Sequence, residues 1–312
     1  MGGTKVRVAT FDPASGWADG PLDERDFPTP REGDVSEGLA DIIRTMTGSR
    51  KISAVGAGCP GPLDPQRGVV LNPPNLSESW WNLDVPGSLS RHLGVPPGHI
   101  AVDNDCNLAA LGEWRFGAGR QYPSTLYVTV STGVGGGLVV DGEIYSGSRG
   151  FAAEVGHMKL TDEPFWCGCG RTGCVESAIS GPSIVRRARE SGWTPKGGSD
   201  PTTRDIFEAA NSGDRAAYGI IELAAGYFAE ALVNFVYAYD PAVIVVGGGV
   251  TDQDLFMRLT FDAMNLVPMM PAFRGVPVVK AALGGRSVVA GAFVLAGHIA
   301  GMAGEPEYPD PL

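Results

Sequence analysis

The most informative stretch of the chain is Cys167-Gly168-Cys169-Gly170-Arg171-Thr172-Gly173-Cys174, and His157 stands ten residues before its first cysteine. Three thiolates and one imidazole are a ligand set for tetrahedral zinc, and four protein ligands make such a site structural rather than catalytic. The interleaved glycines permit the tight loop that lets sulfurs two residues apart share one metal. Three free or redox-active thiols are the alternative, and Cys59 and Cys106 are expected to be plain buried residues.

Further towards the N-terminus, Asp103-Asn104-Asp105 lies where a predicted strand ends and a predicted helix begins. Helix capping is one interpretation, because Asp and Asn are preferred at the N-cap. A general base is the other, because a carboxylate at a strand's carboxyl end can take a proton from a hydroxyl that attacks a phosphoryl group. Spacing alone does not choose between them. Glu154 and Glu176 flank the cysteine loop, and taken singly each would be a solvated surface charge.

Glycine accounts for 45 of the 312 residues, about twice its usual share, so many backbone positions need positive φ or close approach. Three glycine-rich turns adjoin predicted strands: Gly2-Gly3-Thr4, Ser131-Thr132-Gly133 running to Gly137, and Gly247-Gly248-Gly249. Glycine lets backbone N–H groups point at phosphate oxygens. Each turn alone is more often only a turn, and none fits the Walker pattern or the dinucleotide fingerprint. The three together favour a nucleotide site.

Apolar periodicity predicts strands and helices in alternation, which is typical of an α/β fold. The expected strands are 5–11, 52–58, 68–71, 100–103, 125–132, 138–140, 143–145 and 242–246. The expected helices are 35–46, 107–116, 182–190, 206–210, 216–238, 254–264 and 287–300. We expect a surface loop over 193–203 and disorder over 304–312. A weak internal echo, a glycine turn followed by an alternating strand, suggests a duplicated fold with a nucleotide in the cleft between its halves.

The formal net charge of −11 argues against nucleic acid and anionic membrane as partners, because phosphate backbones need a basic surface. The N-terminus has no apolar signal-peptide region, and no apolar run reaches the length of a membrane span. Five cysteines, three of them within eight residues, suit a metal site in a reducing compartment better than a disulfide framework. We therefore expect a cytoplasmic protein.

Taken together, these motifs resemble those of the ROK family (repressors, open reading frames and sugar kinases) and occur in the family's order over nearly the whole chain. The matching stretches are Gly2-Gly3-Thr4-Lys5, Cys59-Pro60-Gly61-Pro62, Asn104-Asp105 before Ala-Ala-Leu-Gly-Glu113, Ser131-Thr132-Gly133 to Gly137, Gly150 to His157, and Cys167 to Glu176. The resemblance implies an actin-like, hexokinase-type duplicated α/β fold with ATP and sugar in the cleft between two domains. The domains expected are 1–103 with 288–312, and 104–287 with the zinc loop at 157–174.

The resemblance also implies roles for single residues in phosphorylating a hexose with ATP and Mg²⁺. Asp105 would be the general base, and the sugar would be bound by Gly61, Asn104, Asp105, Glu154, His157 and Glu176. His157 would ligate structural zinc with Cys167, Cys169 and Cys174 through one nitrogen and contact sugar through the other. The nucleotide would be bound by Gly2, Gly3, Thr4, Lys5, Thr132, Gly133, Gly247 and Gly248.

The same resemblance implies glucose as the first candidate substrate, with N-acetylmannosamine and N-acetylglucosamine as alternatives, and a homodimer or homotetramer. The family also contains sugar-sensing repressors, which carry a helix-turn-helix segment ahead of the first glycine turn. A non-catalytic sugar-sensing regulator is therefore a further alternative, although the general base Asp105 argues for an enzyme.

The chain departs from the family's pattern at two points. The family carries an Asp two residues before the first Gly-Gly, on a strand that precedes it, whereas Met1 stands directly before Gly2 here. A start codon assigned too far downstream is the explanation that we favour. The second departure is Ala153, where the family commonly has glycine before the glutamate, and this could shift Glu154.

Overall fold

A computed structural model describes residues 1–301, so the disorder expected for 304–312 lies outside the described residues. The chain divides into two compact units. Unit 1 consists of Met1–Ser124, Gly137–Ala152 and the residues from Ala282 onwards, and unit 2 consists of Thr125–Gly136 and Ala153–Ala281. In this division, residues 105–116 and 137–152 belong to unit 1. The domain boundary expected between residues 103 and 104 stays a prediction.

Unit 1 contains three small sheets. β1 (Lys5–Thr10) pairs antiparallel with β2 (Asp23–Pro28), and β3 (Val55–Cys59) pairs parallel with β7 (Ile100–Asn104). The third sheet is antiparallel and consists of β4 (Leu63–Asp64), β5 (Val69–Val70) and β6 (Leu83–Asp84). Because β3 and β7 are parallel neighbours, the loops that follow them leave the sheet at the same edge.

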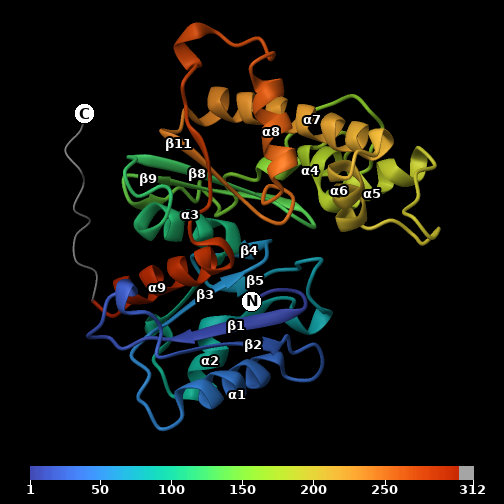
Figure 1. Cartoon of the computed structure of the whole chain (residues 1–312). Coiled ribbons are helices and arrows are strands. Elements are labelled where there is room, and N and C mark those ends of the chain that lie inside the picture. Colours follow the sequence, from blue (N-terminus) through green and yellow to red (C-terminus); the bar gives the residue numbers. More distant parts are fainter. Residues whose placement is uncertain (302–312) are drawn as a thin grey trace. The chain divides into compact units, whose positions relative to one another are not determined.

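The helices of unit 1 are α1 (Val35–Thr47), α2 (Val85–Leu93), α3 (Asp105–Phe116) and α9 (Ser287–Ile299). α3 and α9 come from distant parts of the sequence and lie side by side (Figure 1). The two helices come close together at glycine residues. A Cβ atom added to Gly291 would lie 1.9 Å from the carbonyl oxygen of Leu108, and one added to Gly112 would lie 2.2 Å from the carbonyl oxygen of Ser287. Only glycine at these two positions allows the backbones to come so close.

A buried carboxylate strengthens this helix pair. Glu113 has no exposed surface. Its two oxygens accept hydrogen bonds from the backbone N–H groups of Ala118 (2.9 Å), Ala282 (3.0 Å) and Leu283 (2.9 Å) and from the hydroxyl of Ser287 (2.7 Å). Hydrogen bonds to an ionised acceptor are stronger than neutral ones. Glu113 therefore fastens the start of α9 to the end of α3.

Unit 2 contains β11, β12, nearly all of β8 and the first residues of β9, which belong to a five-stranded sheet in the order β10-β9-β8-β11-β12. The strands are β8 (Ser124–Val130), β9 (Val134–Val140), β10 (Glu143–Ile144), β11 (Val243–Gly247) and β12 (Val278–Lys280). The helices are α4 (Val175–Ile179), α5 (Gly181–Glu190), α6 (Thr203–Asn211), α7 (Arg215–Tyr239) and α8 (Asp254–Met264). β11 is buried along its whole length, as expected for a strand with parallel neighbours on both sides.

α7 is the one described helix that is long and apolar enough to cross a membrane, by length and composition. The expectation from the sequence was that no apolar run is long enough to span a membrane, and α7 differs from it. In the structure 61% of its apolar window is buried inside the protein, which is also true of the core helix of a soluble protein.

Most predicted elements are confirmed, including α8 with its two ends at 254 and 264. The glycine run 133–137 is the main error, because only 131–133 is a turn and β9 begins at Val134. The reason is that other backbone segments pack closely against the strand at Gly136 and Gly137. A Cβ on Gly136 would stand 2.9 Å from the carbonyl oxygen of Ala153, and one on Gly137 would stand 2.4 Å from that of Cys106. These two glycines therefore permit close approach of other backbone segments rather than a turn.

Candidate active site and metal centre

The predicted zinc ligands are brought together in unit 2. The ligand atoms of His157, Cys167, Cys169 and Cys174 all lie within 4.8 Å of one another. The Sγ atom of Cys167 is 3.5 Å from Nδ1 of His157, and the Sγ atoms of Cys169 and Cys174 are 3.7 Å apart. Tetrahedral zinc, bonded at about 2.3 Å to sulfur and 2.0 Å to nitrogen, separates its ligand atoms by about 3.5–3.8 Å. The four residues therefore fit a closed zinc site.

Local backbone bonds shape the cysteine loop. The N–H of Cys167 donates to the carbonyl of Arg171 (2.8 Å), and the N–H of Gly170 donates back to the carbonyl of Cys167 (3.0 Å). Gly170 and Gly173 have φ of +88° and +69°, the left-handed region that favours glycine. Burial raises the pKa of the Cys167 thiol to about 12, so a metal bound here would have to displace its proton.

Glu176, in the first turn of α4, connects the metal cluster to the glycine turn after β8. Its Oε1 atom accepts from the Cys167 thiol at 3.5 Å, and its Oε2 atom accepts from the N–H of Val134 at 3.1 Å. A Cβ on Gly133 would stand 2.7 Å from Oε2, so glycine there leaves room for the carboxylate. One side chain therefore contacts both a predicted zinc ligand and the predicted phosphate turn.

Glu154 is exposed and lies directly before the short turn Val155–His157. The preceding residue, Ala153, has φ of +60°. A left-handed conformation costs a residue with a Cβ about 1–2 kcal/mol, which explains why glycine would suit this position. Ala153, where the family commonly has glycine, is therefore a strained position directly before Glu154, a predicted sugar contact.

In unit 1, residues predicted to bind sugar follow neighbouring strand ends. Cys59 at the end of β3 is paired in register with Asn104 at the end of β7, so the loop containing Gly61 and the start of α3 leave the same edge. The side chain of Asn104 caps α3 by accepting from the N–H groups of Cys106 (2.8 Å) and Asn107 (3.4 Å). The capping interpretation is therefore confirmed for Asn104.

The two aspartates beside Asn104 have different surroundings. Asp103 is buried, and its Oδ1 atom accepts from the N–H of Asn104 (2.6 Å) and from Nδ2 of Asn107 (2.8 Å). Burial raises the pKa of Asp103. Asp105 is only half-buried and accepts from the N–H of Cys106 (2.9 Å). Asp103 is thus a structural group, whereas Asp105 has the exposure that a base needs.

A cavity of about 850 Å³ lies within unit 2. It is lined by Ser131 and Thr132 after β8, by Gly249 and Val250 after β11, and by residues of α5 and α6. Of the residues predicted to bind nucleotide, Thr132 lines this cavity, whereas Gly133, Gly247 and Gly248 do not. No motif pointed to the lining residues that come from the helices, which include Arg189, Arg204, Phe207 and Asn211.

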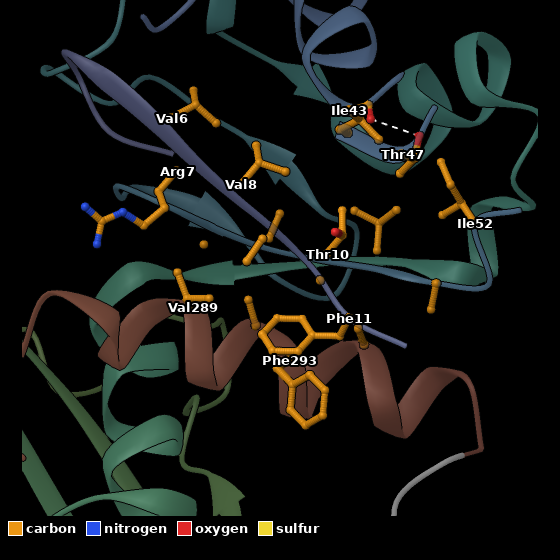
Figure 2. A pocket seen from close by; sticks show the side chains of 18 of the residues that line it. Val6, Arg7, Val8, Thr10, Phe11, Ile43, Thr47, Ile52, Val289 and Phe293 are labelled. Atoms are coloured by element: carbon orange, nitrogen blue, oxygen red, sulfur yellow. Dashed lines mark hydrogen bonds between the residues drawn. The ribbon is translucent and has the colours of Figure 1, made fainter. Parts of the chain in front are cut away.

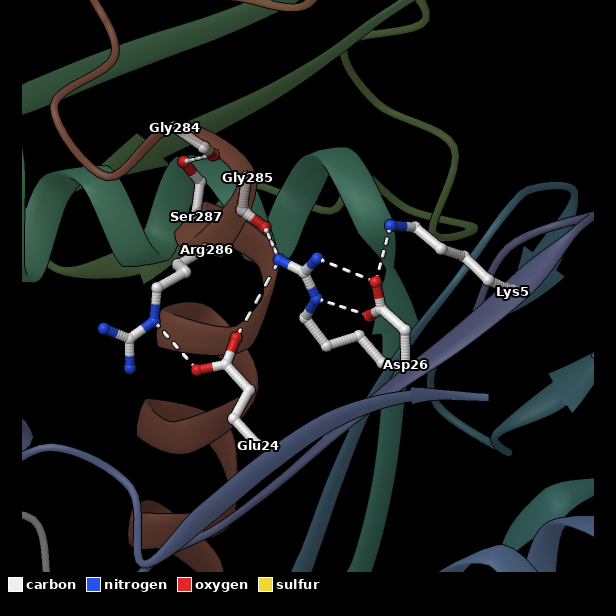
Figure 3. A network of polar contacts seen from close by, with 8 residues as sticks. Lys5, Glu24, Asp26, Gly284, Gly285, Arg286 and Ser287 are labelled. Carbon is white, nitrogen blue, oxygen red and sulfur yellow. Dashed lines mark hydrogen bonds and ion pairs between the residues drawn. The ribbon is translucent and has the colours of Figure 1, made fainter. Parts of the chain in front are cut away.

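The first glycine turn lies in unit 1. The N–H of Gly2 donates to the carbonyl of Lys5 (2.9 Å), and a Cβ on Gly3 would stand 2.4 Å from the carbonyl oxygen of Asn75. The Lys5 ammonium forms an ion pair with the carboxylate of Asp26 on β2, at a distance of 2.8 Å (Figure 3). The Arg7 guanidinium and the Lys5 ammonium together hold the pKa of Asp26 well below its usual range. The expectation that Gly2, Gly3, Thr4 and Lys5 contact the nucleotide stays a prediction.

Comparison with known proteins agrees with this fold. The model of the ROK family matches residues 1–299. A glucokinase of Thermotoga maritima is 31% identical over 253 residues, 78% of each chain. The crystal structure of a ROK hexokinase from Thermus thermophilus is 33% identical with a TM-score of 0.80 over 94% of each chain. A ROK family glucokinase from Streptomyces griseus, solved with glucose and AMPPNP, is 30% identical with a TM-score of 0.77 and covers 96% of this chain and 97% of its own.

The fold and the similarities define a protein of the sugar kinase class with the actin-like ATPase fold. The chain belongs to the ROK family, as its motifs indicated.

Proposed function

We propose that this protein transfers the γ-phosphoryl group of ATP to a hydroxyl of a hexose, with glucose as the first candidate. The observation that carries the proposal is the half-buried carboxylate of Asp105, which follows β7 directly as the first residue of α3, the helix that Asn104 caps. A carboxylate so placed is available to accept the proton of the attacking hydroxyl. The similarity to a glucokinase that was solved with glucose and AMPPNP supports the same reaction.

We assign hexose binding to Gly61, Asn104, Asp105, Glu154, His157 and Glu176. The geometry of His157 suits a double role, since its Nδ1 atom faces the Cys167 sulfur and its Nε2 atom is left for a sugar hydroxyl. Zinc bound at the four ligands would fix the imidazole and, through Cys174 at the N-cap of α4, the start of the helix that carries Glu176. The metal would thereby hold sugar-binding residues without taking part in the chemistry.

For the nucleotide we propose the cavity of unit 2. The Thr132 hydroxyl and the backbone of 131–133 supply donors to phosphate oxygens, and Arg204 adds positive charge at the cavity wall. We infer that Gly2, Gly3, Thr4 and Lys5 also bind nucleotide, and that Gly133, Gly247 and Gly248 shape the turns beside the cavity. Mg²⁺ arriving with ATP would offset charge on the transferring group.

An assay of ATP consumption against glucose, other hexoses, N-acetylglucosamine and N-acetylmannosamine tests the proposal. We expect turnover to be highest with glucose, and to be abolished when the sugar is omitted. Highest turnover with an N-acetylhexosamine would replace the substrate but keep the reaction. Binding of a sugar without turnover of any of them would favour a sensor over an enzyme. We further propose a cytoplasmic homodimer or homotetramer, which sedimentation of the purified protein would test.

Replacing Cys169 by serine is expected to remove the bound metal and to weaken hexose binding. Cys169 is the exposed member of the cluster, so the substitution disturbs little packing, whereas serine is a poor zinc ligand. Metal analysis should find about one zinc per wild-type chain and little in the variant. Cys106→Ser, outside the cluster, is the control and should keep its zinc. A wild-type protein purified without zinc would contradict the assignment.

A further inference from the structure

A cavity of about 770 Å³ in unit 1 belongs to the candidate active site, because its lining residues include Gly2, Lys5 and Asp105. Figure 2 shows apolar side chains on its walls, among them Val8 of β1 and Phe293 of α9. Since predicted nucleotide contacts and the proposed base line this cavity, it does not form a separate site.

Two neighbouring arginines of α5, Arg186 and Arg187, lie outside that cavity and outside the cavity of unit 2. Arg187 is buried, with 6% of its surface exposed. Within residues 1–301, its Nε and Nη2 atoms have no hydrogen-bond partner. Burying a charge is costly unless the surroundings compensate it, so the groups around this guanidinium indicate what it does.

Both arginines donate hydrogen bonds to carbonyls near the end of α4. Nη2 of Arg186 donates to the carbonyl of Ser177 at 2.7 Å, and Nη1 of Arg187 donates to the carbonyl of Ala178. The last carbonyls of a helix have no partner within it, and arginine side chains can satisfy them. α4 has only five residues and its N-cap is Cys174. The two arginines therefore hold a short helix that starts at a predicted zinc ligand.

The same two guanidinium groups hold the other end of the cysteine loop through Phe165. The Cζ atoms of Arg186 and Arg187 lie 4.3 and 4.9 Å from the centre of the Phe165 ring. A cation is attracted to an aromatic face, more strongly where both are withdrawn from water. Phe165 stands two residues before Cys167, and its carbonyl accepts from the N–H of Gly173 at 2.8 Å. Fixing this ring therefore fixes the backbone that leads to the first sulfur.

α7 supplies a further contact to Arg187. The Arg187 Cζ atom lies 5.2 Å from the centre of the Tyr227 ring, and the Tyr227 hydroxyl donates to Oε1 of Glu163 at 2.6 Å. Burial lowers the pKa of Arg187, and the negative charge of Glu163 opposes that shift. Two aromatic rings and a nearby carboxylate thus stabilise the buried cation, and Glu163 itself lies two residues before Phe165 in the same loop.

We propose that Arg187, assisted by Arg186, is a positioning residue that holds both ends of the cysteine loop, the Phe165 end and the α4 end, and so presets the zinc ligands and Glu176. Its guanidinium acts through Phe165 and Ala178 and touches neither metal nor sugar. Groups that orient metal ligands in this way commonly change metal affinity by about 10–100-fold. The proposal rests on the zinc site and the hexose site proposed above, and it adds the residue that fixes their geometry.

Arg187→Met tests this role, because methionine fills space beside the rings but carries neither the charge nor the donors. We expect zinc release to a chromogenic chelator to be about 10–100-fold faster than from the wild type. We expect KM for the hexose to rise about tenfold, with kcat and KM for ATP nearly unchanged, because only sugar-binding groups are displaced. Arg187→Lys keeps the charge and a donor to Ala178, so it should recover most of both effects. Arg258→Met, at an exposed arginine of α8, is the control and should match the wild type.

Phe165→Leu is a second variant, which leaves the arginine bonds to α4 in place and tests the route through the ring. Phe165 is only half-buried and lies in a loop, so this variant keeps the test available if Arg187→Met does not fold. It should release zinc faster than the wild type. In the double variant with Arg187→Met, the two effects should combine to clearly less than their product, because residues that act through one contact are not additive.

Two results would overturn the proposal. One is zinc release and hexose KM in Arg187→Met and Phe165→Leu that equal those of Arg258→Met. The other is a rise in KM for ATP as large as that for the hexose, with no recovery in Arg187→Lys, which would make Arg187 a general support of unit 2. A wild-type chain without zinc would overturn the metal site and this proposal together. Zinc release needs neither ATP nor sugar, so a chain that phosphorylates no hexose would contradict the proposed function alone.

Discussion

Replacing Asp105 by asparagine is expected to lower kcat about 10²–10⁴-fold, the range typical for loss of a general base, while hexose affinity stays nearly unchanged. Asparagine keeps the size and the hydrogen-bond acceptor of the aspartate, and it can still accept from the N–H of Cys106 as Asp105 does. It cannot take the proton of the attacking hydroxyl. Steady-state kinetics with the preferred sugar and calorimetric titration with that sugar would measure the two quantities separately.

Asp103→Asn is the matched control for this prediction, since it makes the same change two residues away. Asparagine at 103 can accept both hydrogen bonds that Asp103 accepts, from the Asn104 N–H and the Asn107 amide. Burial already raises the pKa of Asp103, so a neutral side chain suits its surroundings. We expect kcat of this control within about tenfold of wild type. Equal kcat values for wild type and Asp105→Asn would remove Asp105 from the mechanism.

Replacing Glu113 by glutamine is expected to lower the free energy of unfolding of unit 1 by roughly 2–6 kcal/mol. The two carboxylate oxygens accept four hydrogen bonds, two on each oxygen. An amide keeps only one oxygen, and its NH₂ group would face two donors that then have no acceptor. Each buried donor left unsatisfied costs about 1–3 kcal/mol. Urea titration followed by hydrogen exchange of α3 and α9 amides would report the loss.

The control for Glu113 is Glu32→Gln in the same unit, where the glutamate is exposed on a loop. Surface substitutions of this kind usually change stability by less than about 0.5 kcal/mol. A Glu113 variant that unfolds at the same urea concentration as the control would show that the buried network contributes little. In that case, the close glycine contacts between α3 and α9 would hold the helix pair alone.

The elements that the sequence predicts well are those whose signals are local. The hairpin between β9 and β10 follows from Asp141-Gly142, whose φ angles of +49° and +83° are those that the dipeptide favours. β2 was missed because it is rich in charge. It lies at a sheet edge where Asp26 binds Lys5 and Arg7 on β1, so cross-strand ion pairs take the place of an apolar alternation. α2 was missed because Pro86 and Gly87 occupy its first turn, where both are tolerated after the Asp84 cap.

In the candidate site, too, some parts follow from local sequence signals and others do not. The grouping of His157 with the three cysteines was predictable because loop spacing alone limits how far apart the sulfurs can be. The lining of the unit 2 cavity was not predictable, since Arg189 and Arg204 reach it only through the packing of α5 and α6. The packing of α9 (Ser287–Ile299) on β3 (Val55–Cys59) was not predictable either, because more than 220 residues of sequence separate them.

The fastening of α9 by Glu113 has a consequence for synthesis on the ribosome. Chains emerge N-terminus first and fold as their parts become available. The carboxylate of Glu113 meets three of its four donors only after residues 282–287 have been made. Most of unit 2 lies between 153 and 281, so it can complete its fold while unit 1 still awaits its last helix. A chain released early, before α9, would expose the apolar surface that α9 covers and become a substrate for quality control.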